Sequence, residues 1–168
     1  MNGEGGGSPL SVPDVVIIFK KPLSGVDRPA LLRFARRARR LAGVHGEVSI
    51  LVAGNRQIQA LNRRFRKKNK PTDVLSFPRD GGGDIAISAD IARQNAARYR
   101  HSAASELKVL ILHGMLHLAG HDHEKDNGRM ENLEARLRAK LKLPVSLIDR
   151  ARKAVEGNVR PAARGRSR

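Results

Sequence analysis

The chain has 168 residues, 40% of them hydrophobic, which suits one domain with a sizeable core and is too short for two. Lysine and arginine number 33 against 16 aspartates and glutamates, so the formal net charge is +17 at pH 7. Such a balance favours a polyanionic partner, most often nucleic acid, although a merely basic and soluble surface would give the same charge. The absence of cysteine excludes disulfides and thiolate metal sites, so any metal must be held by nitrogen and oxygen.

The expected strands and helices alternate between the two ends of the chain. In chain order we expect a strand at 15–19, a helix at 28–41, a strand at 48–52, a helix carrying Ile58, Leu61 and Phe65, strands at 74–77 and 84–87, a helix ending near Arg100, a helix after Ser102, a helix at 125–141 and a helical turn at 146–155. These elements predict an α/β or α+β fold, in which about five helices cover a small four-stranded mixed sheet.

Polar and turn-forming residues mark where these elements begin and end. Asp27, Ser102 and either Ser88 or Asp90 are suitable N-caps. Pro78 should stop the third strand, and the segment 79–83 reads as a glycine-rich hairpin loop. The helix after Ser102 is apolar nearly all round, so we expect it in the middle of the protein.

Both ends of the chain differ in composition from the rest. Residues 1–13 are rich in glycine, serine and proline, and residues 157–168 carry four arginines and no acid. We expect two flexible tails around a single domain at 14–156. The N-terminus lacks the pattern of a signal peptide, and no apolar run approaches the length of a membrane span. We therefore expect a cytoplasmic location and no membrane association.

Four of the six histidines fall within residues 113–123. His113 and His117 are four residues apart, so a helix would place both on one face, where they can reach the same ion. Gly120 suits the left-handed end of that helix, after which the chain can return His123 to the ion in the H-x-x-x-H-x-x-G-x-x-H frame of metzincin zinc sites. His121 would lie inside the turn, so His123 is the preferred third ligand.

Three neutral imidazoles leave one position of a tetrahedral zinc ion open, as in catalytic sites. Asp122 either orients a ligand or caps the following helix. Zinc peptidases with this frame carry a glutamate general base directly after the first histidine, and here that position is Gly114. The substitution argues against a peptidase, and a mid-helix glycine suggests that backbone or substrate comes close.

Basic residues gather in a second segment, where six of the eight residues at 63–70 are lysine or arginine. Arg66, like the other arginines of this segment, suits a phosphate ligand, because a planar guanidinium can form two hydrogen bonds to a phosphate. Arg63, Arg64, Lys67, Lys68 and Lys70 either provide a sequence-blind surface for RNA or form a solvated loop. Aromatic residues make up only 3% of the chain, which gives little support for a platform on which bases stack.

The histidine segment resembles the YbeY family of rRNA maturation endoribonucleases. Their signature H-G-x-L-H-L-x-G-x-D-H is matched by His113, Gly114, Leu116, His117, Leu118, Gly120, Asp122 and His123. Upstream blocks match at Leu61, Asn62, Arg66, residues 71–78, residues 83–85 and Ile87. The specific resemblance covers residues 61–123.

The resemblance implies a zincin-like site with one Zn²⁺ or another divalent ion on His113, His117 and His123, and a functional arginine at Arg66. It implies a single-strand-specific endoribonuclease that acts on rRNA precursor at the small ribosomal subunit, in 16S rRNA 3′-end maturation and ribosome quality control. We expect the protein to be a monomer. Two rival functions remain. One is a ribosome-associated assembly factor whose metal is mainly structural, which the missing general base would favour, and the other is a metallopeptidase.

Overall fold

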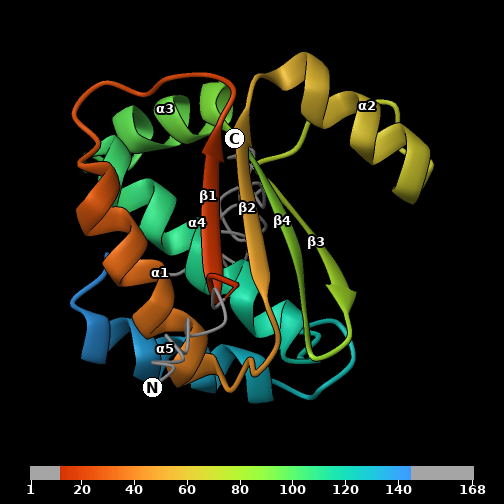
Figure 1. Cartoon of the computed structure of the whole chain (residues 1–168), viewed down its shortest axis with the longest axis vertical. Coiled ribbons are helices and arrows are strands. Elements are labelled where there is room, and N and C mark those ends of the chain that lie inside the picture. The colour runs from red at the N-terminus through yellow and green to blue at the C-terminus, as the bar shows by residue number, and fades with distance from the viewer. Residues whose placement is uncertain (1–11, 145–168) are drawn as a thin grey trace, which may run out of the picture.

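A four-stranded mixed sheet forms the middle of the protein (Figure 1). The computed structural model describes residues 12–144. Its elements are β1 (Val15–Phe19), α1 (Arg28–Ala42), β2 (Val48–Ala53), α2 (Asn55–Arg66), β3 (Val74–Arg79), β4 (Gly82–Ser88), α3 (Ala89–Arg98), α4 (Ala103–Leu118) and α5 (Arg129–Leu141). The strand order is β1-β2-β4-β3; β1, β2 and β4 are parallel, and β3 is an antiparallel edge strand. The predicted fold class is confirmed.

The two faces of the sheet are covered unequally. Alternate strand residues such as Ile50 and Ile85 belong to the main core with apolar residues of α1, α3, α4 and α5. The intervening residues Ala53, Leu75 and Ala86 form a smaller core with Ile58 of α2. This alternation follows from the two-residue period of a β-strand. The sheet therefore separates α2 from the other four helices of the described segment.

The helix α4 is the buried centre of the main core, as predicted from its composition. It runs over 16 residues, and the side chains of Leu110, Ile111 and Leu116 are fully buried. The predicted N-cap Ser102 accepts a hydrogen bond from the backbone N–H of Ser105 at 3.0 Å. Among residues 12–144, no helix is both long and apolar enough to span a bilayer.

The structure confirms most of the predicted element ends. Asp27 caps α1, Ser88 rather than Asp90 caps α3, and Gly43 ends α1 in the left-handed conformation. The helix α3 stops at Arg98, short of Arg100, whose positive φ of 56° breaks the helix. The predicted tails, apart from Val12 and Pro13, and the helical turn at 146–155 lie outside the described residues.

Two predicted strand ends were wrong. The strand β3 continues through Pro78 to Arg79, because an edge strand pairs on one side only and tolerates a residue without an N–H. The strand β4 begins at Gly82, two residues earlier than expected. A Cβ at Gly82 would lie 2.1 Å from the carbonyl oxygen of Glu47, so only glycine allows this close approach. The hairpin itself is the short turn at Asp80 and Gly81.

The start of the last helix was also wrong, because α5 begins at Arg129 and not at Lys125. Asn127 and Gly128 have φ values of 55° and 83°, which a right-handed helix cannot include. Asp126 instead accepts a hydrogen bond from the backbone N–H of Met130 at 2.8 Å. The segment between His123 and Arg129 is therefore a capped turn.

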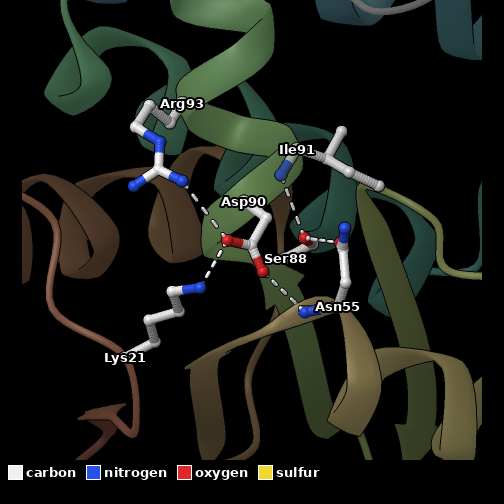
Figure 2. A network of polar contacts seen from close by, with 6 residues as sticks. All are labelled: Lys21, Asn55, Ser88, Asp90, Ile91 and Arg93. Carbon is white, nitrogen blue, oxygen red and sulfur yellow. Dashed lines mark hydrogen bonds and ion pairs between the residues drawn. The ribbon is translucent and has the colours of Figure 1, made fainter.

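A polar network joins the ends of the parallel strands to the starts of two helices (Figure 2). The N-cap Gly54 of α2 has no side chain, and the carboxylate of Asp90 on α3 accepts the hydrogen bond from the Asn55 N–H at 2.8 Å in its place. Lys21, which follows β1, donates to the other Asp90 oxygen. Asp90 thus anchors the start of α2, the helix that carries Arg66.

Replacing Asp90 with asparagine should destabilise the fold in a pH-dependent way. The hydrogen bond from Lys21, followed by that from the Asn55 N–H, holds the pKa of Asp90 below its ordinary value of 3.8. A depressed pKa stabilises the fold above the unfolded-state pKa, and that stabilisation is lost as the pH falls through the folded-state pKa. We expect the variant to lose about 1 kcal/mol at pH 7 and the difference to shrink below about pH 4.

Urea unfolding of both proteins at pH 7 and pH 3 measures this difference. Asp84→Asn is the matched control, because the Arg79–Asp84 pair at 3.4 Å is largely exposed. Its effect should stay within about 0.5 kcal/mol. A pH-independent loss in Asp90→Asn would contradict the role assigned to the carboxylate charge.

Candidate metal centre

Three histidines converge at the end of α4. One ring nitrogen from each of His113, His117 and His123 lies within 4.8 Å of the others. The Nε2 atoms of His113 and His117 are 3.0 Å apart. Two nitrogens at about 2.0–2.1 Å from one tetrahedral ion are about 3.3 Å apart, close to this spacing. The donor set and its spacing therefore fit a zinc-like divalent ion.

Local backbone geometry explains how the third histidine returns to the first two. Gly120 has a φ of 92°, and its N–H bonds to the carbonyl of His117 while the N–H of His121 bonds to that of Leu116. These two bonds form the Schellman turn, which reverses the chain at a helix end. The predicted left-handed glycine is therefore present, and the two residues that follow Gly120 bring His123 over the helix end.

The two other polar residues of the turn have different surroundings. Within residues 12–144, the converging set leaves out His121, which instead lines the cleft beside it. The carboxylate of Asp122 accepts a hydrogen bond from the Glu124 N–H at 3.1 Å. Asp122 thus stabilises the turn after His121, and it does not cap the following helix, because α5 begins only at Arg129.

The electrostatics of the site favour neutral ligands. Burial, with smaller effects from His113 and His123, lowers the pKa of His117 to about 4, although Asp122 opposes the shift. His117 is therefore an uncharged imidazole at pH 7. A neutral ring has a free lone pair, which is the form that binds a metal ion.

A cleft of about 640 Å³ lies over the three histidines. The cleft is also lined by Arg66, at the end of α2, and by residues of β3. The Arg66 guanidinium donates to the carbonyl of Ser76 at 3.0 Å, and the Ser76 hydroxyl donates to the carbonyl of Gly114 at 3.4 Å. Ser76 therefore connects Arg66 to the turn of α4 that carries His113.

The remaining basic residues of the segment 63–70 lie outside this cleft. All five are exposed, and none of them is among the residues that line it: Arg63, Arg64, Lys67, Lys68 and Lys70. The loop that carries the lysines folds back on α2, because the buried Asn62 side chain donates to the carbonyl of Lys70 at 2.8 Å. The structure thus separates one arginine in the cleft from a basic surface beside it.

Gly114 faces the sheet and not the cleft. A Cβ at this position would lie 2.9 Å from Cδ1 of Ile85, a fully buried side chain of β4. The close approach suggested by a mid-helix glycine is therefore the approach of the α4 backbone to the sheet. A glutamate here would point into the core, so this helix cannot present a peptidase-type base from position 114.

The sequence prediction missed one buried acid beside the histidines. Glu134 on α5 is 1% exposed, and its Oε2 lies 3.6 Å from Nδ1 of His113. Glu134 follows Met130 by four residues and precedes Leu137 by three, and all three are buried. An acid on the apolar face of an amphipathic helix was the signal that could have identified it.

Metal analysis of the purified protein tests the choice of third ligand. We expect about one zinc ion per chain, lost in His123→Ala because a donor is removed from the converging set, and retained in His121→Ala. Elemental analysis after dialysis against a weak chelator measures the content. The opposite pattern in the two variants would replace His123 with His121 as the ligand.

Comparisons with known proteins identify one family from the sequence and a matching fold from a solved structure. The model of the family described as Endoribonuclease YbeY matches residues 28–142. An Endoribonuclease YbeY of Koribacter versatilis is 58% identical over 82% of this chain and 93% of its own length. An Endoribonuclease YbeY of Solibacter usitatus is 47% identical over 80% of this chain and 92% of its own length. The solution structure of TM1509 from Thermotoga maritima shares the fold, with a TM-score of 0.56 and 23% identity over 89% of this chain and 99% of its own. The chain belongs to the YbeY family.

Proposed function

We propose that this protein is a metal-dependent endoribonuclease that cleaves single-stranded rRNA precursor. The observation that carries the proposal is the cleft that holds both the three converging histidines and Arg66. The names of the relatives, each an Endoribonuclease YbeY, support RNA as the substrate. The finer function is maturation of the 16S rRNA 3′ end and ribosome quality control, carried out in the cytoplasm by a monomer at the small ribosomal subunit.

In this mechanism His113, His117 and His123 hold one Zn²⁺ or a similar divalent ion. When bound, the ion supplies a Lewis acid that polarises a phosphoryl oxygen or a water molecule. Arg66, which lines the same cleft, binds a non-bridging phosphate oxygen and stabilises the negative charge that grows there during cleavage. Its hydrogen bond to the Ser76 carbonyl fixes the guanidinium relative to the histidines.

The exposed cations beside the cleft suit a backbone-directed approach of RNA. The five exposed cations along α2 and its loop contribute to the net charge of +17 of the chain: Arg63, Arg64, Lys67, Lys68 and Lys70. Phosphate contacts of this kind bind strands of any sequence. We therefore expect ribosomal context, more than base sequence, to select the cleavage site.

Replacing Arg66 with alanine should impair both RNA binding and cleavage. Loss of one cation flattens the slope of log affinity against log salt by about one unit. Loss of charge stabilisation in the transition state should slow cleavage of an rRNA precursor roughly 100-fold. Anisotropy titrations at several salt concentrations and single-turnover cleavage assays measure the two effects, with Arg66→Lys expected to recover the slope but not the full rate.

Arg37→Ala is the matched control, because Arg37 is an exposed arginine of α1 and does not line the cleft. His117→Ala separates the enzyme from an assembly factor with a structural metal: the enzyme should still bind RNA but no longer cleave it. Cleavage that survives in a folded His117→Ala protein would overturn the proposal, as would equal effects of the Arg37 and Arg66 substitutions.

A further inference from the structure

Two buried atoms without hydrogen-bond partners face each other behind the histidine cluster. They are Nδ1 of His113 and Oε2 of Glu134. The two atoms are 3.6 Å apart, just beyond hydrogen-bond range, and their side chains are 7% and 1% exposed. Buried polar atoms are normally paired, so this arrangement calls for a physical reason.

The orientation of His113 supplies that reason. Its Nε2 points at Nε2 of His117, on the side where the donors converge, and its Nδ1 points away towards α5. A neutral imidazole that gives its Nε2 lone pair to an ion carries its proton on Nδ1. That proton needs an acceptor, and the nearby carboxylate oxygen needs a donor.

No other cation accounts for the buried carboxylate. Among the described residues, no lysine or arginine forms an ion pair with Glu134, whose one ionic contact is with His113. A buried carboxylate is costly unless it is paired or lies close to a metal ion. Glu134 is therefore placed for a site that becomes positively charged when it is filled.

We propose that Glu134 is a positioning residue that accepts a hydrogen bond from the Nδ1–H of His113 and so holds the Nε2 lone pair towards a bound divalent ion. The inference rests on the metal site of the proposed function and adds a residue from a separate helix to it. Carboxylates that support histidine ligands in this way typically raise metal affinity 10- to 100-fold.

Zn²⁺ affinity, measured by competition with a chromogenic chelator, tests this role without an activity assay. We expect Glu134→Leu to bind Zn²⁺ 10- to 100-fold more weakly, and Glu134→Gln, whose amide oxygen can still accept, to fall between it and the wild type. The thermal stability of the metal-free Glu134→Leu protein should be unchanged or higher, because an unpaired buried carboxylate is removed. Glu124→Leu controls for the loss of a negative charge near the site, since Glu124 is an exposed neighbour of His123.

The outcomes separate this inference from the proposed function. Unchanged Zn²⁺ affinity in Glu134→Leu, together with lost affinity in His113→Ala, would overturn the role of Glu134 alone. Unchanged affinity in both variants would overturn the metal site itself. A less stable metal-free protein with normal Zn²⁺ affinity, or an equal loss in Glu124→Leu, would also contradict the positioning role.

A separate observation concerns Phe65, which precedes Arg66 at the end of α2. It is 54% exposed and is the only exposed phenylalanine or tyrosine in the described part of the chain. The edge contact with Phe77, at 5.2 Å between ring centroids and 61° between planes, holds the ring in place. Arg64 lies over the ring at 5.2 Å from the centroid.

An exposed, fixed aromatic ring among cations is the usual composition of a surface that binds single-stranded nucleic acid. We infer that Phe65 stacks on a base of the RNA whose phosphate lies at Arg66. This inference also rests on the proposed function. It revises the expectation that a low aromatic content gives little support for a stacking platform, because one exposed ring is enough for one base.

Binding of two single-stranded oligonucleotides of equal length, one with bases and one abasic, tests the stacking. Phe65→Ala should weaken binding of the base-containing strand roughly 5- to 100-fold and leave the abasic strand unaffected, while Phe65→Tyr should bind both strands normally. Equal losses for the two strands would show that Phe65 acts through the fold and would overturn the inference. Arg66→Ala should weaken binding of both strands. If Arg66→Ala weakens binding and Phe65→Ala does not, the stacking inference fails and the proposed function still stands.

Discussion

The close packing of α4 on the sheet is the constraint on which the site depends. Gly114 allows it, because a Cβ would lie 2.9 Å from Ile85, and the helix backbone then comes within reach of the Ser76 hydroxyl on the edge strand β3. The same Ser76 accepts from Arg66 through its carbonyl. One close contact between helix and sheet thus fixes the distance between the histidines on α4 and the arginine that ends α2.

Features set by local backbone chemistry could be predicted from the sequence. The four-residue spacing of His113 and His117 and the left-handed Gly120 decide the geometry of the histidine cluster within a dozen residues, so His123 could be chosen over His121. Features set by distant contacts could not. Gly82 extends β4 because the backbone of Glu47 lies against it. The residues next to Gly82 in the sequence do not indicate that contact.

The surroundings of Glu134 also depend on a distant contact and could not be predicted from the sequence. Its place on the buried face of α5 can be found from the spacing of Met130 and Leu137 alone, but the residue that it faces comes from another helix. Periodicity thus identifies an unusual buried acid, while only tertiary packing identifies its neighbour.

The three histidines differ in how firmly the fold holds them. His113 is buried on α4, His117 is half-buried one turn later, and His123 is exposed on a turn whose shape depends on Gly120 and on the hydrogen bonds that Asp122 and Asp126 accept. Two of the histidines therefore lie on a rigid helix, and the third belongs to a turn whose ordering costs conformational entropy. The rigid, water-excluded side is the one next to Glu134. The exposed side opens into the cleft that Arg66 also lines, so an ion bound by the three histidines would be open to a long polyanion on the side where the protein covers it least.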